Sequence, residues 1–163
     1  MFQAAIITAS DKGAQGQRED VSGQVIREIL EANDYNVVHQ VILPDDREQL
    51  ADEMRRICDA GEADLILTTG GTGFSPRDWT PEATLDVVER LVPGIPEAMR
   101  FASLQITKRA MLSRAVAGIR KGTLIINLPG SPKAVRENLE YVISELEHGL
   151  QILRGEAGEC ARK

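Results

Sequence analysis

Continuous apolar runs alternate with amphipathic segments along most of the chain. Residues 4–10 ("AAIITAS"), 35–43 ("YNVVHQVIL") and 63–69 ("ADLILTT") are apolar without strict alternation, which is typical of strands buried on both faces of a sheet. Apolar residues at 3.6-residue spacing follow the first run, in a helix capped by Ser22, and the second, in a helix from about Asp46 to Ala60. Repeated strand–helix units predict a mainly parallel sheet.

Two apolar runs near residue 120 interrupt this alternation. Residues 115–120 and 123–129 are separated only by Lys121-Gly122, which predicts a β-hairpin and hence one antiparallel strand. Further helices are predicted from Pro81 to about Arg90, after Pro96, and from Ser131-Pro132. The predicted fold class is therefore α/β: a three-layer sandwich with a mostly parallel, mixed β-sheet covered by helices on both faces.

Length and composition indicate one globular domain. The 163 residues suit a single α/β unit, so we expect one domain over 1–163 with a flexible tail from about residue 154. The two cysteines, Cys58 and Cys160, are too few for a disulfide framework, which favours a reducing, cytoplasmic location. No apolar run has the length of a membrane span and no secretion-signal pattern is present, so we expect no membrane association.

Polar residues gather where the predicted strands end. Ligands of open α/β sheets bind beyond the carboxyl ends of the strands. Four loops lie there: Ser10-Asp11, "LPDD" (Leu43–Asp46), Gly70–Asp78 and "NLPGSPK" (Asn127–Lys133). Because parallel strands end at the same edge, these loops predict one polar crevice.

The turn after the third strand is rich in glycine. Gly70, Gly71 and Gly73 permit positive φ and close backbone approach, so that consecutive amides can face an anion, with the hydroxyls of Thr72 and Ser75 beside them. A tight strand-to-helix connection explains the same glycines equally well. No Walker motif and no G-x-G-x-x-G is present, which argues against a Rossmann dehydrogenase.

Two acidic residues, Asp78 and Asp45, are candidate functional carboxylates. We expect Thr80 to cap the following helix, which leaves Asp78 free for chemistry. Asp45 and Glu48 have the spacing of a capping box, and the spacing alone favours Asp45 as a cap. If Asp46 caps the helix instead, Asp45 faces the crevice.

The loop before the last helix repeats this pattern. Pro129 and Gly130 precede Ser131, the expected cap, and the free amides of a helix N-terminus form an anion site. A plain helix cap is the alternative.

The overall charge of the chain is −6, from 19 basic and 25 acidic residues. Binding to a nucleic-acid backbone needs a basic stripe, so we expect no nucleic-acid partner. Lys12, Arg77 and Lys133 flank the polar loops in sequence and predict a locally positive crevice.

Two long segments, "LILTTGGTGFSPRDWTPEAT" and "AMLSRAVAGIRKGTLIINLPGSPKAV", together with "ITASDKG" and "LPDD", closely resemble the MogA/MoaB family of molybdenum-cofactor biosynthesis. The resemblance runs from about residue 4 to about residue 145. It implies a molybdopterin adenylyltransferase that transfers AMP from ATP to molybdopterin and releases pyrophosphate. It also implies a homotrimer that passes its product to a molybdate-insertion partner protein.

The resemblance also assigns residues. It places the two catalytic carboxylates on Asp45 and Asp78, with Asp46 as the alternative to Asp45, and these acids suit Mg²⁺, which uses one or two carboxylates with substrate phosphates. The expected substrate-binding residues are Ser10, Asp11, Gly70, Gly71, Thr72, Gly73, Ser75, Pro129, Gly130 and Ser131. Two alternatives remain, a non-catalytic molybdopterin carrier of the MoaB branch and a trimeric scaffold with connector loops only.

Overall fold

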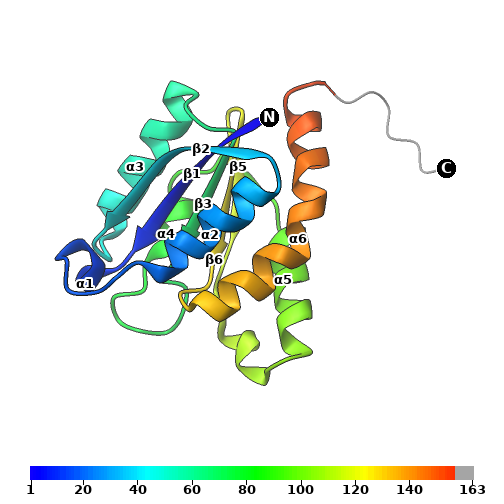
Figure 1. Ribbon diagram of the computed structural model, residues 1–163. Helices are drawn as coiled ribbons and strands as arrows, with labels where there is room; N and C mark the ends of the chain where they lie inside the picture. Colours follow the sequence, from blue (N-terminus) through cyan, green and yellow to red (C-terminus); the bar gives the residue numbers. More distant parts are fainter. Residues whose placement is uncertain (157–163) are drawn as a thin grey trace.

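One mixed β-sheet with helices on both faces organises residues 1–156, the part of the chain that the computed structural model describes (Figure 1). Its strands are β1 (Phe2–Ala9), β2 (Tyr35–Leu43), β3 (Leu65–Thr69), β4 (Arg90–Leu91), β5 (Ala117–Arg120) and β6 (Thr123–Leu128). Its helices are α1 (Asp11–Ala14), α2 (Val21–Ala32), α3 (Arg47–Ala60), α4 (Thr80–Leu85), α5 (Gly94–Leu104), the 3₁₀ helix η1 (Lys108–Leu112) and α6 (Pro132–Leu153).

The sheet is mostly parallel. Across the described residues the strand order is β2-β1-β3-β6-β5-β4. β1 pairs in parallel with β2 and β3, and β3 pairs in parallel with β6, so Ile6 lies opposite Leu67 and Leu67 opposite Ile126. β5 and β6 form the predicted antiparallel hairpin, with Lys121 in its turn at a φ of 50°.

Each face of the sheet has its own hydrophobic core. On one face Ile6 packs with Ile26 of α2 and Leu139 of α6, and on the other Ile7 packs with Met54 of α3. Figure 1 shows α2, α5 and α6 on one side of the sheet and α3 and α4 on the other. The three-layer α/β prediction is therefore confirmed.

Several element boundaries differ from the predictions. α4 stops at Leu85, short of the expected Arg90, because the amides of Glu89 and Val92 bond to β5 across the short strand β4. α2 is capped by Asp20, which accepts from the Gly23 amide at 2.9 Å, and not by Ser22. α5 begins at Gly94, before Pro96, since proline is tolerated in a first helical turn.

The C-terminal region is held at its start. Arg154 forms an ion pair with Asp64 at 2.6 Å, just beyond the end of α6. The tail predicted from about residue 154 is described as far as Glu156, and residues 157–163, which include Cys160, lie outside the described residues. Cys58 lies in the core, and burial raises the pKa of its thiol to about 11. Within residues 1–156 we find no helix with the length and apolar character required to span a bilayer.

Candidate active site

A cleft of about 590 Å³ opens beyond the carboxyl ends of β1, β2, β3 and β6. The N-termini of α2 and α6 border it, and in Figure 1 these ends lie near α1 at the same end of the sheet. Its lining includes Thr8, Ser10, Gly13, Arg18, Glu19, Asp20, Ser22, Asp45, Thr69, Gly70, Gly71, Asp78, Gly130 and Ser131. The four predicted loops therefore meet in one polar crevice.

The fold brings most of the predicted site residues to this cleft, although not all of them. Those that line it are Ser10, Asp45, Gly70, Gly71, Asp78, Gly130 and Ser131. Asp11 and Ser75 do not line the cleft, but their backbone amides donate hydrogen bonds to the carboxylates of Asp45 and Asp78, respectively. Thr72, Gly73 and Pro129 instead border a separate apolar cavity of about 280 Å³ beneath α5.

Two of the glycines adopt the left-handed backbone conformation that favours glycine. Gly70 has φ of +89° and Gly71 has φ of +70°. A Cβ on Gly70 would collide with the Ala9 carbonyl oxygen, and one on Gly71 with the Thr80 hydroxyl. Gly73 does not have a positive φ, contrary to our expectation; a Cβ there would lie 3.0 Å from the carboxylate of Asp78. The absence of a side chain at Gly73 therefore makes space for the Asp78 carboxylate, and its backbone conformation does not itself require glycine.

The Asp78 carboxylate closes the glycine loop by accepting hydrogen bonds from its backbone amides. One carboxylate oxygen, Oδ2, accepts hydrogen bonds from the amides of Gly73 and Ser75, both at 3.1 Å. The prediction that Thr80 caps α4 is wrong, because the N-cap position is Trp79, which makes no side-chain cap bond. Thr80 is instead the first helical residue, fully buried, and its hydroxyl has no hydrogen-bond partner among the described residues. Asp78 is therefore a cleft residue because of the loop geometry and not because the cap is filled.

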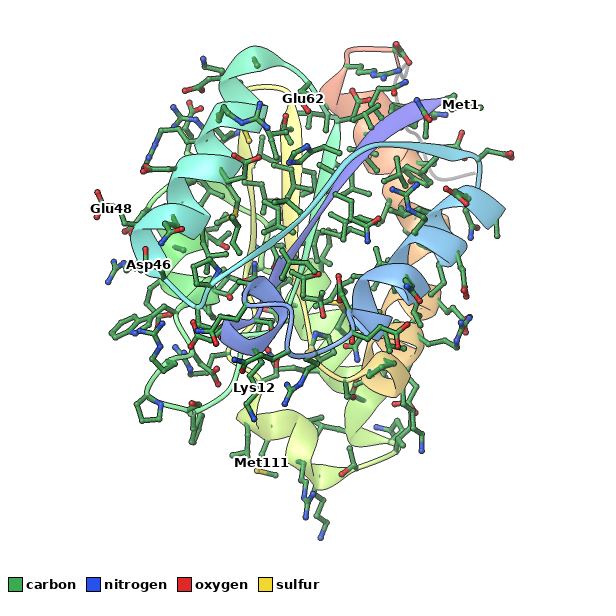
Figure 2. The ribbon with its side chains drawn as sticks, turned by 60° about the vertical axis from the view of Figure 1, so that its left-hand side comes forward. Met1, Lys12, Asp46, Glu48, Glu62 and Met111 are labelled. Atoms are coloured by element: carbon green, nitrogen blue, oxygen red, sulfur yellow. The ribbon has the colours of Figure 1, made fainter. Side chains whose placement is uncertain are left out.

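The adjacent acids Asp45 and Asp46 have different roles at the start of α3. Asp46 caps this helix by accepting from the Gln49 amide at 2.9 Å, and Figure 2 shows Asp46 and Glu48 together at its start. The Asp45–Glu48 capping box favoured by the spacing is therefore wrong, since the helix begins one residue later. Asp45 lines the cleft, as the family resemblance implied.

A reciprocal pair of hydrogen bonds fixes Asp45. Its Oδ2 accepts from the Asp11 amide, and Oδ1 of Asp11 accepts from the Asp45 amide, both at 3.0 Å. Arg77 binds the Asp11 carboxylate with two hydrogen bonds of 3.0 and 2.9 Å, which lowers the pKa of Asp11. Burial raises the pKa of Asp45, and the charges of Asp11 and Asp78 add to this effect. A cation bound beside the charged Asp45 carboxylate would therefore offset the unfavourable effects of its burial and of the neighbouring negative charges.

Arg114 is a contributor that the sequence did not reveal. Its guanidinium donates to the carbonyl oxygens of Gly73 at 2.7 Å and Asp78 at 2.8 Å and forms an ion pair with Glu82 of α4. Its own amide donates to the Thr72 carbonyl at 2.9 Å. Arg114 therefore holds both ends of the 73–78 loop. Its only signal was its position in "MLSR", because no spacing rule links that segment to a loop 36 residues earlier.

Hydrogen bonds between loops join the remaining walls of the cleft. The Thr69 hydroxyl donates to the Pro129 carbonyl, and the Ser22 hydroxyl donates to the Gly130 carbonyl, each at 2.7 Å. Ser131 caps α6 by accepting from the Ala134 amide at 3.2 Å, as predicted. The segment before α2 also lines the cleft, and its residues Arg18, Glu19, Asp20 and Ser22 were missed as site residues.

The described part of the chain supplies only a partial set of metal ligands. Residues 1–156 contain no group of three or more His, Cys, Asp or Glu side chains arranged to hold a metal ion. Asp45 and Asp78 nevertheless line one cleft from different loops. Such a pair fits Mg²⁺, which commonly takes one or two protein carboxylates and completes its coordination with waters and substrate phosphates.

Comparison with known proteins places this geometry in a family. The family model described as a probable molybdopterin binding domain matches residues 5–148. The molybdopterin adenylyltransferase of Helicobacter pylori J99 is 42% identical over 92% of this chain and 86% of its own length. The enzyme of the same name from Escherichia coli K12 is 39% identical over 86% of this chain and 73% of its own length.

Solved structures give the same result. The crystal structure of the molybdopterin biosynthesis enzyme MoaB from Thermus thermophilus superposes with a TM-score of 0.90 at 46% identity, covering 98% of this chain and all (100%) of that one. A MogA structure superposes with a TM-score of 0.88 at 36% identity, covering 93% of this chain and 99% of that one. The resemblance in the sequence is thereby confirmed, and the chain belongs to the molybdopterin-binding domain family of molybdenum-cofactor biosynthesis, which includes MogA and MoaB.

Proposed function

We propose that this protein is a molybdopterin adenylyltransferase that uses ATP. The phosphate oxygen of molybdopterin attacks the α-phosphorus of ATP and forms a new phosphoanhydride bond. The bond from the α-phosphorus to the oxygen bridging the β-phosphorus breaks, and pyrophosphate leaves. The products are adenylyl-molybdopterin and pyrophosphate.

One observation carries this proposal: the strand-end loops of a chain related to named adenylyltransferases bring two carboxylates and two glycine loops to one cleft. Joining two polyanions requires their phosphates to be held close together, and positioning supplies much of the rate acceleration in such reactions. The left-handed turn at Gly70 and Gly71, which line the cleft, and the N-terminus of α6 behind Ser131 are suited to bind phosphate oxygens.

Mg²⁺ is the cofactor that the acids fit best. Asp45 and Asp78 would hold it, and it would neutralise the negative charge that develops on pyrophosphate. Asp45 is prepared for a cation by the burial and neighbouring charges that raise its pKa. Asp78 keeps its second carboxylate oxygen outside the loop hydrogen bonds, which use Oδ2.

The test is incubation of purified protein with Mg-ATP and molybdopterin, followed by chromatographic detection of the adenylylated pterin. Product formation by the wild type, lost in an Asp78→Asn variant that still binds molybdopterin, supports the enzyme. The carrier alternative predicts molybdopterin binding without product in either protein.

We extend the proposal to assembly and location. Exposed apolar side chains gather on α5, η1 and the turn between them, namely Phe101, Leu104, Ile106, Met111 and Leu112. Apolar patches of this kind mark interaction surfaces, which supports self-association, and the family resemblance implies that the assembly is a homotrimer. Light scattering on the purified protein tests it, because any mass other than that of three chains would refute it. We also propose that the reaction takes place in the cytoplasm and that its product passes to a molybdate-insertion partner protein.

A further inference from the structure

The charged side chains that line the cleft are mostly acidic. Four carry a carboxylate, Glu19, Asp20, Asp45 and Asp78, and Arg18 is the single basic residue among the lining side chains of the described chain. A site that binds two phosphate-bearing substrates beside four carboxylates needs positive charge at the surface of the cleft.

The basic residues expected from the sequence do not supply this charge. Arg77 is engaged by Asp11, and Lys133 is 85% exposed with its nearest acid, Glu137, at 4.0 Å. Lys12 is exposed on α1 (Figure 2), and none of these three residues is part of the cleft lining. Arg114 is not available either, because its guanidinium already binds the carbonyl oxygens of Gly73 and Asp78 and the carboxylate of Glu82.

Arg18 is free to bind a ligand. Its side chain is exposed and forms no ion pair or hydrogen bond within residues 1–156. The adjacent backbone is held, because Asp20 accepts from the Thr8 hydroxyl at 2.7 Å and caps α2. The guanidinium is thus carried on an anchored segment at the wall of the cleft, with its donors unused.

We propose that Arg18 is a substrate-binding residue that holds a phosphate group in this cleft. The proposal rests on the adenylyl-transfer function for the identity of that phosphate, which belongs to ATP or to molybdopterin. A guanidinium binds two phosphate oxygens at once in a fixed planar geometry, so Arg18→Lys keeps the charge and loses the bidentate contact. Arg18 acts on binding and leaves the chemical step to the acids.

The experiment is isothermal titration calorimetry of wild type, Arg18→Gln, Arg18→Lys and Arg90→Gln with Mg-ATP, pyrophosphate and molybdopterin in separate titrations. Arg90 is the matched control, because it is an exposed arginine of β4 outside the cleft. We expect Arg18→Gln to weaken Kd about tenfold for the ligand that it holds, as loss of one charge-assisted contact does. Arg18→Lys should recover part of this loss, and Arg90→Gln should match the wild type.

The titrations separate the two sources of phosphate. Weakening for Mg-ATP and pyrophosphate assigns Arg18 to the triphosphate, and weakening for molybdopterin alone assigns it to the pterin phosphate. Kinetics should show a higher KM for the same substrate with an almost unchanged kcat, because binding is lost equally in the ground and transition states.

Two results overturn the proposal. One is that Arg18→Gln and Arg90→Gln bind all three ligands alike, and the other is that the wild type binds none of them. A wild type that binds but does not turn over, with Arg18→Gln still weakened, refutes adenylyl transfer while supporting Arg18 as a phosphate ligand.

Discussion

Replacing Asp45 and Asp46 separately should divide function from stability. Asp46→Ala removes the carboxylate that accepts from the Gln49 amide at 2.9 Å at the start of α3. Loss of such a cap costs about 1 kcal/mol, which lowers Tm by about 2–4 °C in a protein of this size. Asp46 is not among the cleft-lining residues, so we expect transfer activity close to that of the wild type.

Asp45→Asn should have the opposite effect. The amide oxygen of asparagine can still accept from the Asp11 amide, now bonded to Asp45 at 3.0 Å, so the loop contact is retained. Loss of a carboxylate beside the reacting phosphates should reduce kcat/KM by about 100-fold, as removal of one preorganised electrostatic group does. It should also shift the Mg²⁺ dependence of transfer to higher concentration.

The pH dependence gives the sign of the stability change. The folded-state pKa of Asp45 is raised above its ordinary value of 3.8, first by burial and then by the charges of Asp11 and Asp78. The folded protein therefore holds this proton more tightly than the unfolded chain, and the charged carboxylate destabilises the fold above the raised pKa. Asp45→Asn should have a Tm equal to or above that of the wild type at pH 7. This difference should shrink as the pH falls through the raised pKa toward 3.8 and below.

The assay is a pair of melting curves across pH together with Mg²⁺ titrations of transfer for both variants. An active, destabilised Asp45→Asn beside an inactive, stable Asp46→Ala would refute the reasoning. It would show that the two acids have the reverse roles.

Three further substitutions test the loop. Gly71→Val should abolish Mg-ATP binding measured by calorimetry, because a Cβ there meets the Thr80 hydroxyl and φ is +70°; normal affinity would make the loop a mere connector. Arg114→Met should lower both Tm and kcat/KM by releasing the Gly73 and Asp78 carbonyls, with partial recovery in Arg114→Lys; unchanged kinetics would remove Arg114 from site positioning. Asp78→Asn should keep the wild-type circular dichroism spectrum and lose most transfer; full activity would exclude Asp78 from the mechanism.

The layers of the fold were predictable from the sequence because its buried strands are continuous apolar runs. Residues 35–43 formed β2 with the predicted bounds, and the Lys121-Gly122 turn marked the hairpin. β4 was missed because it has only two residues, Arg90 and Leu91, both exposed, which leave no periodic pattern.

Helix caps were less predictable where several suitable residues adjoin. Asp20 competes with Ser22, and Asp46 with Asp45, and each choice depends on which backbone amide the folded loop presents. Ser22 is drawn away by a hydrogen bond to the Gly130 carbonyl, 108 residues distant in sequence. Local spacing carries no information about such contacts.

The lining of the cleft was predictable where a loop follows the end of a strand, as with Gly70, Gly71 and Gly130. Arg114 and Arg18 were missed for a different reason. The fold places the carbonyl oxygens of Gly73 and Asp78 beside Arg114, and it places Arg18 at the wall of the cleft. Neither neighbourhood can be inferred from local sequence.

The central claim is tested most directly with ATP labelled at a known phosphorus. In one reaction the α-phosphorus carries ³²P, and in a second the γ-phosphorus does, each with Mg²⁺, molybdopterin and purified protein. Adenylyl transfer predicts that α-label appears in the pterin product and that γ-label appears only in pyrophosphate. Transfer of γ-label to the pterin, or no labelled pterin from either ATP while molybdopterin remains bound, would contradict the account.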